Sequence, residues 1–447
     1  MVKCNCIQGR TAGEIVESIR GLVIGNHIHP GQKLPTVREL AESLGVNRNT
    51  VSLAYQRLVS MGMAITNGRL GTVISSAVTQ GEQEGYSDAK VRVNLASGNP
   101  DPTFLPDPVR LMPSLKYQPV LYGHPTLNPR LKAWAEHNFN NLEKPAFKVV
   151  ACNGAVDALE RLTSAHLVRG DRVAVEDPGY LGSVNALRLA GLVPVGIEID
   201  SDGVMPSALY QALQKGVKAV LITPRAQNPT GSALSKVRAR ELKNVLMEFP
   251  DVLVIIDDHF FMLSDKNYYN VIPNGSRRWA VIRSFSKPLG PDLRFALMAS
   301  DDYTHELISA RLAAGTNWVS HFIQCLVAAC VSDPEVLSGI SKAGRAYKKR
   351  REMLCKGLQN VGFKPCSAQD GFNVWVQFDP NVDAELVVDQ LLQKGWLVRA
   401  GKDFELSRKT NALRVTAATL TLDEAEHFCY TLKEIVNSLT MRFNTFT

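Results

Sequence analysis

Short apolar runs alternate with helical patterns through the middle of the chain, and this alternation restricts the possible folds more than any other feature of the sequence. The apolar runs are Lys148–Ala151, Arg172–Val175, Ala219–Thr223, Val252–Ile256 and Trp279–Ile282. Strands separated in this way by helices pair into a largely parallel sheet, because each helix carries the chain back to the starting edge of the sheet. We therefore predict an α/β fold whose ligands bind beyond the C-terminal ends of the strands.

The chain is long enough for at least two domains, because it has 447 residues and single cores stop growing at roughly 250–300 residues. No apolar run reaches the roughly 18–20 residues of a transmembrane helix, and residues 1–10 lack the apolar stretch of a signal peptide. Eight cysteines without a CxxC pair suit neither a disulfide scaffold nor a zinc site. The sequence predicts a cytoplasmic protein with no membrane partner and no bound metal.

Positive charge is concentrated near the N-terminus. Residues 1–75 contain eight Lys and Arg against four Glu, whereas residues 76–447 contain 42 basic residues against 39 acidic ones. A small basic module in front of a large, nearly neutral one is typical of a protein whose first module contacts nucleic acid.

Three helix-start signals divide the basic module. Thr11 and Thr36 each stand three residues before a Glu, which is the capping-box pattern, and Asn47 is a third cap. We predict a first helix over about 12–25, a second helix that ends at Gly45, and a third helix that begins at Asn47. Two short helices joined by a three-residue turn would form a helix-turn-helix.

A hairpin signal follows the third helix. Residues 63–66 and 72–74 have strand-forming side chains and flank Asn67-Gly68, a dipeptide that is typical of a tight turn between two strands. This hairpin would form a wing beside the helix-turn-helix.

Residues 30–73 resemble the winged-helix domain of the GntR-type bacterial transcription regulators at nearly every framework position. The resemblance implies double-stranded operator DNA as the partner. Side chains at the start of the third helix would reach base edges, and arginines at the helix and wing tips would bind phosphates. Any one arginine could equally be a solvated surface charge, but their grouping favours DNA. The residues placed on DNA in this way are Arg38, Arg48, Thr50, Asn67, Gly68 and Arg69.

A polar segment separates the basic module from the rest of the chain. Residues 76–92 lack apolar periodicity and are rich in Ser, Gly, Gln and Glu, so we predict a flexible linker with a span of roughly 25 Å. The linker would join a DNA-binding domain over residues 1–75 to a second domain over residues 93–447.

A lysine follows the last of the predicted strands. Lys287 lies in the segment Ser284–Gly290, between that strand and a Pro/Gly loop, with hydroxyl groups beside it and Arg294 nearby. Such a lysine suits an imine with an aldehyde cofactor that carries a phosphate. At the ends of two preceding strands, Asp257 could keep a pyridine nitrogen protonated, and Asn228 could donate to a phenolic oxygen.

From about Leu95 to Arg414 the chain resembles the fold-type I aminotransferases, and it is most similar to the MocR subfamily, in which a GntR-type winged helix is fused to this fold. The resemblance implies pyridoxal 5'-phosphate as the cofactor. It also implies a large α/β part over about 120–340 and a smaller α+β part built from about 93–119 and 341–447.

The same resemblance assigns roles to residues of the expected pocket. Lys287 would form the internal aldimine, Asp257 would pair with the pyridine nitrogen, and Asn228 would contact the phenolic oxygen. Tyr180 would stack on the ring.

Two further groups of residues are assigned by the resemblance. Arg414 would bind the α-carboxylate of an amino compound, and Gly98 would line the same place. The phosphate would be held by the backbone amides of Gly154, Ala155 and Val156, by the side chains of Ser284 and Arg294, and by Tyr122 of the partner subunit.

His259 stands where many members of this subfamily have Tyr, whose hydroxyl tunes the imine. An imidazole at this position changes both the reach and the protonation of the group. The alternative is that His259 simply packs beside Phe260 and Phe261. The segment Asn153–Asp157 offers few side-chain hydroxyls or amides for a phosphate, which concerns the affinity for the cofactor rather than its identity.

Three functions fit the sequence: a transcription regulator that uses bound pyridoxal phosphate, alone or with an amino compound; an aminotransferase with a vestigial head; and a sensor of pyridoxal phosphate that controls vitamin B6 metabolism. The intact head favours a regulator over an enzyme. Lys287, Asp257 and Arg414 leave a slow half-transamination open. Because two subunits complete the pocket of this fold, the resemblance also implies a homodimer whose two heads read two half-sites.

Overall fold

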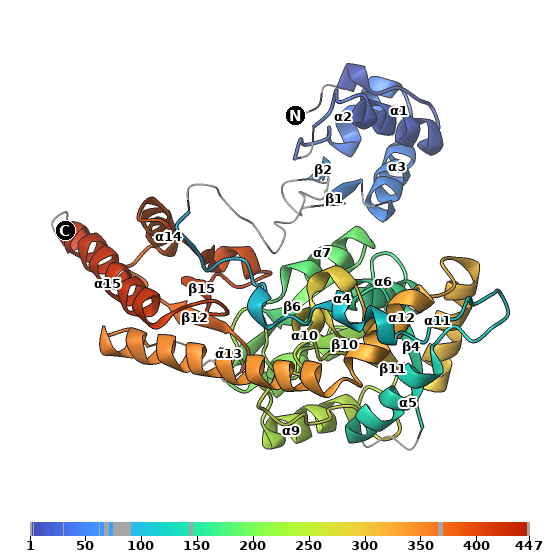
Figure 1. Cartoon of the computed structure of the whole chain (residues 1–447). Helices are drawn as coiled ribbons and strands as arrows, with labels where there is room; N and C mark the ends of the chain where they lie inside the picture. The colour runs from blue at the N-terminus through green and yellow to red at the C-terminus, as the bar shows by residue number, and fades with distance from the viewer. Residues whose placement is uncertain are drawn as a thin grey trace. The chain divides into compact units, whose positions relative to one another are not determined.

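The structure is a computed structural model that describes residues 2, 4–29, 31–61, 63–66, 71–74, 91–142, 146–364 and 370–444 (Figure 1). The chain forms two compact units, one built mainly from Met1–Gly81 and one that holds most of residues 82–447. The predicted wing-tip residues Asn67, Gly68 and Arg69, and residues 76–90 of the predicted linker, lie outside the described residues.

The N-terminal unit contains the predicted helices. Both capping boxes form, because the hydroxyls of Thr11 and Thr36 accept from the backbone N–H groups of Glu14 and Glu39. Gly45 ends the second helix with φ at 65°, a left-handed conformation that glycine adopts without steric cost. The elements are η1 (Cys4–Cys6), α1 (Ala12–Ile24), α2 (Val37–Leu44) and α3 (Arg48–Ser60).

A hairpin and a small apolar core complete this unit. Strands β1 (Ala64–Thr66) and β2 (Thr72–Ile74) pair in antiparallel fashion, as expected for a wing. The Tyr55 hydroxyl donates to the carbonyl oxygen of Pro35 at 2.8 Å and so ties α3 to the segment before α2. The fully buried side chains where the three helices meet are Ile15, Ile19, Leu40, Val51, Ala54 and Leu58.

The second unit is built around an eight-stranded sheet with the order β4-β11-β10-β9-β8-β5-β6-β7. Each of the five predicted apolar runs forms a strand of this sheet. The strands are β4 (Lys148–Cys152), β5 (Arg172–Asp177), β6 (Val193–Asp200), β7 (Gly203–Val204), β8 (Ala219–Ile222), β9 (Leu253–Asp257), β10 (Trp279–Ser284) and β11 (Ala296–Ser300).

The centre of the sheet is parallel, and near one edge a single strand, β11, runs in the opposite direction. β5, β8, β9 and β10 run parallel to one another, whereas β11 is antiparallel to β10 and β4 is antiparallel to β11. The reversal has a local cause: only the short helices α10 (Ser286–Leu289) and η6 (Pro291–Leu293) join β10 to β11, and a parallel connection would need a long crossover.

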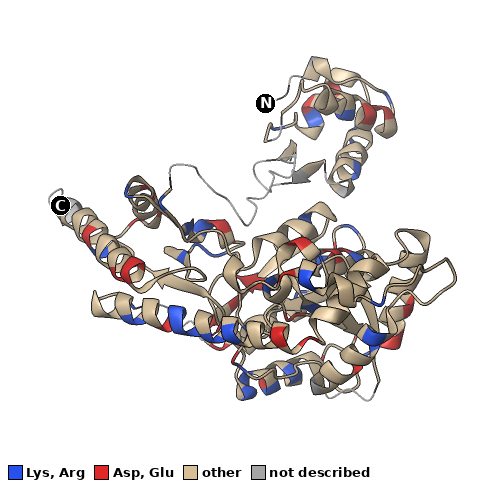
Figure 2. Cartoon of the chain, viewed as in Figure 1, with Lys and Arg blue, Asp and Glu red and all other residues tan. Residues whose placement is uncertain are grey.

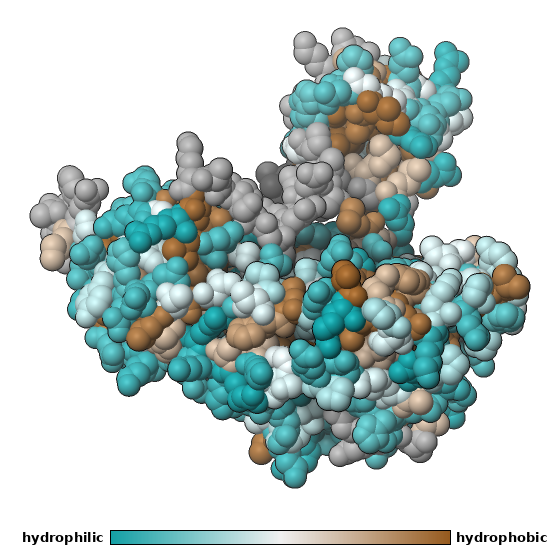
Figure 3. Space-filling model, viewed as in Figure 1, coloured by the Kyte–Doolittle hydropathy of each residue, from teal (hydrophilic) through white to brown (hydrophobic). Residues whose placement is uncertain are grey.

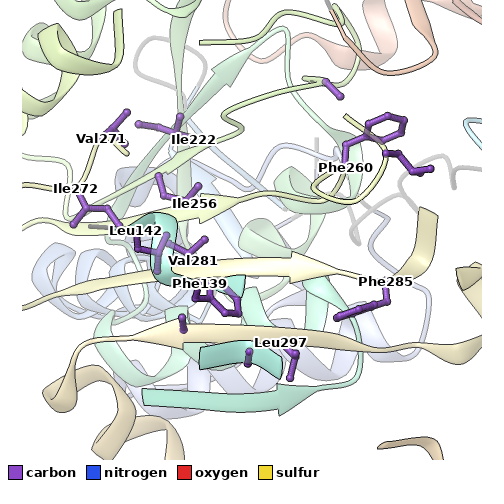
Figure 4. Close-up of a cluster of buried hydrophobic side chains, with 14 of the residues drawn as sticks. Phe139, Leu142, Ile222, Ile256, Phe260, Val271, Ile272, Val281, Phe285 and Leu297 are labelled. Atoms are coloured by element: carbon purple, nitrogen blue, oxygen red, sulfur yellow. The ribbon is translucent and has the colours of Figure 1, made fainter. Parts of the chain in front are cut away.

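Helices cover both faces of the sheet and bury an apolar core against it. Figure 4 shows Ile222, Ile256, Val281 and Leu297 reaching this core from four neighbouring strands. Strands buried on both faces need continuous apolar runs, which is why the sequence displays them so clearly. The helices are α4 (Pro108–Leu111), α5 (Pro129–Asn138), α6 (Ala155–His166), α7 (Leu181–Leu189), α8 (Pro206–Gln214), α9 (Lys236–Met247), α11 (Asp302–Ala314), α12 (His321–Cys330) and α13 (Pro334–Asn360), with the short turns η3 (Pro102–Phe104), η4 (Met112–Ser114) and η5 (Asn140–Leu142).

No single described helix is long and apolar enough to cross a membrane, and the one helix pair that meets the length and composition test, α12 with α13, is bent by 73°.

α13 displays a row of Lys and Arg along its length, visible as blue bands in Figure 2.

The C-terminal part of the second unit has its own small sheets and core. β12 pairs with β15 and β15 with β14, while β13 pairs with β3, a strand that lies at the very start of this unit. The chain therefore enters this part before it builds the large sheet. The elements are β3 (Val93–Asn94), β12 (Asn373–Gln377), α14 (Ala384–Gln393), β13 (Trp396–Leu397), β14 (Arg399–Ala400), η7 (Gly401–Phe404), β15 (Ala412–Thr416) and α15 (Leu422–Asn444).

Candidate functional site

A pocket lies at the C-terminal ends of the parallel strands, where the sequence predicted ligand binding. Its walls come from the ends of β5, β8, β9 and β10, from the start of α6 and from loops of the C-terminal part. The structure brings ten of the predicted site residues into this lining, namely Gly98, Ala155, Val156, Tyr180, Asn228, Asp257, His259, Ser284, Lys287 and Arg294.

Lys287 extends from α10, one turn beyond the end of β10. Its Nζ donates to the carbonyl oxygen of Gly98 at 2.6 Å and lies 5.6 Å from the centre of the Phe372 ring. The side chain is therefore held against one wall of the pocket by a contact that any covalent use of its nitrogen must change.

Asp257 is the last residue of β9 and lines the same pocket. Its Oδ1 is buried, and among the described residues none donates a hydrogen bond to this atom. Burial, together with the neighbouring Asp258, raises the pKa of Asp257 to about 7, even though Lys287 opposes this shift. A buried acceptor of this kind fits the protonated ring nitrogen of a ligand, which would donate to it.

Asp258 has the opposite environment, although it is the next residue. It is fully buried and accepts from Arg225 at 2.7 and 2.9 Å and from Arg283 at 3.2 Å. Burial alone would raise the pKa of Asp258, but the two guanidinium groups outweigh it and hold the pKa below its usual value. Since successive side chains of a strand point to opposite faces, one carboxylate serves the pocket and the other anchors the strand end.

Asn228 and Arg414 form a pair at the pocket wall. Arg414 in β15 donates from Nη1 to Asn228 Oδ1 at 2.9 Å and from Nη2 to the carbonyl oxygen of Ala96 at 2.6 Å. Arg414 is fully buried and is not part of the pocket lining, whereas Asn228 is. A ligand oxygen at this wall would accept from the Nδ2 group of Asn228, because the Oδ1 atom is used by Arg414.

Three anion-binding groups converge at the other end of the pocket. Gly154 is the N-cap of α6 with φ at 95°, and a Cβ atom there would lie 2.8 Å from Arg294 Nη2, so only glycine permits this approach. Ala155 and Val156 form the first turn of α6, whose N–H groups and dipole attract a phosphate. The Ser284 hydroxyl lines the same region.

Tyr180 and His259 supply rings to the pocket, and Tyr122 does not. His259 lines the pocket and also packs edge-on against Phe260, with ring centres 6.2 Å apart, and its role toward an imine stays a prediction. Tyr122 is 83% exposed and packs on Trp318, with ring centres 5.3 Å apart. Its predicted role on the partner's phosphate stays a prediction.

Sequence reasoning missed several groups around the pocket. Glu176 accepts from the backbone N–H of Thr223 at 2.9 Å and from Gln227 Nε2 at 3.2 Å, and burial raises its pKa to about 7. Its place at the end of a predicted strand was the available signal. Asp177, the next residue, accepts from the backbone N–H groups of residues 406–408 and so ties the large sheet to the C-terminal part.

On the N-terminal unit, two of the three arginines predicted to contact DNA lie near the same carboxylate. Glu42 lies 2.9 Å from Arg38 Nε and 3.9 Å from Arg48 Nη2, and all three side chains are exposed. The backbone N–H of Thr50 donates to the carbonyl oxygen of Asn47 at 3.0 Å, inside the first turn of α3. The two arginines thus stand at the starts of the two helices of the helix-turn-helix.

The chain matches two family models. "Aminotransferase class I and II" matches residues 91–432, and "Bacterial regulatory proteins, gntR family" matches residues 11–74. Together the two models account for the predicted winged helix and for the predicted fold-type I aminotransferase architecture.

Relatives with the same two-part organisation are found among transcription regulators. The vitamin B6 salvage pathway transcriptional repressor PtsJ of Salmonella typhimurium is 43% identical over 96% of this chain and 100% of its own length. The probable rhizopine catabolism regulatory protein MocR of Rhizobium meliloti is 24% identical over 77% of this chain and 76% of its own length.

Solved aminotransferases share the fold of the second unit. The multiple substrate aminotransferase of Thermococcus profundus superposes with a TM-score of 0.71 at 21% identity, over 80% of this chain and 93% of its own. The kynurenine aminotransferase of Pyrococcus horikoshii superposes with a TM-score of 0.70 at 22% identity, over 78% and 91%. The chain therefore belongs to the MocR subfamily of gntR-family transcription regulators, in which a DNA-binding winged helix is joined to a domain of the class I and II aminotransferase family.

Proposed function

We propose that this DNA-binding transcription regulator binds pyridoxal 5'-phosphate in the pocket of its second unit and uses the bound cofactor to control operator binding, as a sensor of vitamin B6. The observation that carries the proposal is the buried Oδ1 of Asp257, to which no described residue donates, in a pocket that Lys287 also lines. The relative named as a repressor of vitamin B6 salvage supports the choice of effector.

Three side chains would hold the ring of the cofactor. Asp257 would accept from the ring nitrogen and keep it protonated, Asn228 would donate to the phenolic oxygen, and Lys287 would hold the aldehyde carbon covalently. The cofactor itself supplies an electrophilic carbon and an electron-withdrawing ring. Tyr180 from the loop after β5 would cover one face of this ring.

The phosphate would lie at the N-terminus of α6. Backbone N–H groups of Gly154, Ala155 and Val156, the hydroxyl of Ser284 and the guanidinium of Arg294 offer both hydrogen bonds and positive charge there. With few other side-chain donors in the preceding loop, affinity for the phosphate depends strongly on Arg294.

We also propose a homodimer, in which Tyr122 of the partner subunit would reach this phosphate. The segment around α4 and η4 exposes several apolar side chains, as Figure 3 shows on the face that carries α4 and α12. Scattered apolar side chains are normal on a surface, but a group along one segment is typical of an interface. The exposed apolar side chains are Val109, Met112, Tyr117, Leu121 and Tyr122.

An amino compound is a second candidate effector. Arg414 lies behind Asn228, only 2.9 Å from its Oδ1, so a carboxylate that displaced this contact would meet a buried guanidinium. Such a ligand would need Arg414 to exchange partners, whereas the cofactor alone would not.

A titration of operator DNA with and without pyridoxal 5'-phosphate tests the proposed function. We expect the cofactor to change operator affinity by about 5- to 150-fold, which is the usual range of allosteric coupling, and to strengthen binding if salvage is repressed when its product is plentiful. Borohydride reduction followed by peptide mapping should place the pyridoxyl group on Lys287. A regulator that binds operator identically with and without the cofactor, or a label on another lysine, would contradict the proposal.

A further inference from the structure

The segment Arg92–Asn99 follows the chain that leaves the N-terminal unit, and its carbonyl oxygens contact both cationic side chains of the site. Gly98 O accepts from Lys287 Nζ at 2.6 Å, and Ala96 O accepts from Arg414 Nη2 at 2.6 Å. Two residues of one segment, separated by a single position, therefore bind the two side chains that a cofactor and an amino compound would engage.

The remainder of this segment is fixed by backbone hydrogen bonds to the C-terminal part. β3 pairs with β13, Leu95 N donates to Leu397 O at 2.8 Å, and Thr416 N donates to Leu95 O at 2.8 Å. Asn94 shapes the turn between these two sets of contacts, because its Oδ1 accepts from the backbone N–H of Ala96 at 3.0 Å. The segment is thus a short connection, held by several hydrogen bonds, between the chain before it and the pocket.

We propose that the segment Arg92–Asn99 is the relay by which ligand binding at Lys287 reaches the chain that leads to the DNA-binding head. This inference rests on the proposed function, because it takes pyridoxal phosphate as the ligand. It assigns a regulatory role to residues that touch the site only through their backbone.

The chemistry of the lysine provides the signal. A lysine ammonium has three N–H donors. To react, its nitrogen would first lose a proton to solvent and then attack the aldehyde carbon. The aldehyde oxygen would depart as water together with the two remaining amine hydrogens. The nitrogen of the new carbon–nitrogen double bond would then carry at most one N–H, and only after reprotonation. The nitrogen is also drawn toward the ring and away from Gly98.

Loss of this donor leaves the buried Gly98 carbonyl without its partner. An unsatisfied buried carbonyl is costly, so the segment gains by moving to find another donor. Movement at Gly98 strains the hydrogen bonds that tie Leu95 to Leu397 and Thr416, and a shift of these bonds carries the movement along the backbone to residue 92, where the chain to the head begins.

Full-length protein can test the relay through two variants and a control. In wild type, pyridoxal phosphate should speed hydrogen exchange of the peptide that covers residues 93–99 and change operator affinity. Lys287→Met, which lacks the donor, should show both changes without the cofactor and no further change when it is added. Asn94→Ala should bind operator and cofactor within about two-fold of wild type, yet lose most of the cofactor's effect on operator affinity. Asn244→Ala, on the exposed face of α9, is the matched control and should behave as wild type.

The outcomes separate the relay from the function on which it rests. If wild type shows no effect of the cofactor on operator affinity, the proposed function is wrong. The relay alone is wrong if the cofactor changes the operator affinity of wild type but the two variants do not behave as expected. In that case Lys287→Met would show the hydrogen exchange and operator affinity of cofactor-free wild type, and Asn94→Ala would keep the full effect of the cofactor on operator affinity.

Discussion

Two neighbouring residues, Asp257 and Asp258, illustrate how environment assigns different tasks to the same side chain. Asp258 is satisfied by two buried arginines and stays ionised, whereas Asp257 has a buried oxygen with no donor among the described residues and a pKa raised to about 7. The protein accepts a poorly satisfied carboxylate at the one position where a ligand's ring nitrogen would complete it.

Asp257→Asn should weaken the binding of pyridoxal phosphate by roughly 10- to 150-fold, because a charge-assisted hydrogen bond to the ring nitrogen is lost. Absorbance titration of the cofactor measures this affinity. Asp251→Asn, at an exposed position before β9, is the control and should leave the affinity unchanged. Equal affinities for wild type and Asp257→Asn would remove Asp257 from the site.

The same substitution should stabilise the cofactor-free protein at high pH. At pH 5 the Asp257 carboxyl is protonated in the folded chain and ionised in the unfolded chain, so the folded state binds the extra proton, and stability falls as pH rises toward about 7. Between pH 5 and pH 8, wild type should lose roughly 1–3 kcal/mol relative to Asp257→Asn. Thermal unfolding of both proteins at the two pH values checks this, and parallel pH profiles would contradict it.

At the scale of elements, the helix-turn-helix holds its two leading arginines in a shared ion pair. Arg38 near the start of α2 and Arg48 at the start of α3 both face Glu42, so the carboxylate positions the guanidinium groups and, if they contact DNA as predicted, would compete with the phosphates for them. Exposed pairs of this kind are weak and screened by salt, so DNA should displace the carboxylate easily.

Glu42→Gln should therefore strengthen operator binding by roughly 1.5- to 5-fold at low salt, whereas Arg48→Ala should weaken it by roughly 1–3 kcal/mol. Fluorescence anisotropy with labelled operator, repeated over a range of salt concentrations, measures both effects. Glu17→Gln removes an equally exposed carboxylate paired with Arg20 on α1 and should change nothing. Unaltered affinity in Arg48→Ala would argue against α3 as the helix that reads DNA.

At the largest scale, one chain supplies all the described residues that line the pocket, but its Tyr122 lies on the surface and not in this lining. If Tyr122 acts across a dimer, each site combines Lys287 of one subunit with the tyrosine of the other. The two DNA-binding heads of the dimer would then read two operator half-sites, and the two large units of the same dimer would together form two ligand sites.

A mixture of Tyr122→Ala and Lys287→Ala chains tests this arrangement. In a mixed dimer, the subunit that keeps Lys287 receives an intact Tyr122 from its partner, so one complete site forms, although neither homodimer has one. We expect the mixture, after co-refolding or co-expression, to regain high-affinity cofactor binding at up to half the sites that form in mixed dimers. Spectroscopic titration detects these sites, and no recovery in a mixture shown to contain mixed dimers would place Tyr122 outside the site.

Local structure could be predicted from the order of the amino acids alone. The capping boxes at Thr11 and Thr36, the left-handed Gly45 and the apolar strands are set by interactions among residues a few positions apart, so pattern alone predicts them. Residues at strand ends, such as Asp257 and Asn228, could be assigned to one pocket because parallel strands end at the same edge of a sheet.

The contacts behind that pocket could not be predicted in this way, because they depend on the packed fold. The pairing of β4 with β11, the pair of arginines on Asp258 and the contact of Lys287 with Gly98 depend on how distant segments pack. Arg414 shows the reason most clearly: its hydrogen bonds reach Asn228, 186 residues away, and the backbone of Ala96, 318 residues away. No local preference encodes a backbone carbonyl as the partner of a distant arginine, because every residue carries one, and only the packed fold selects which carbonyl is within reach.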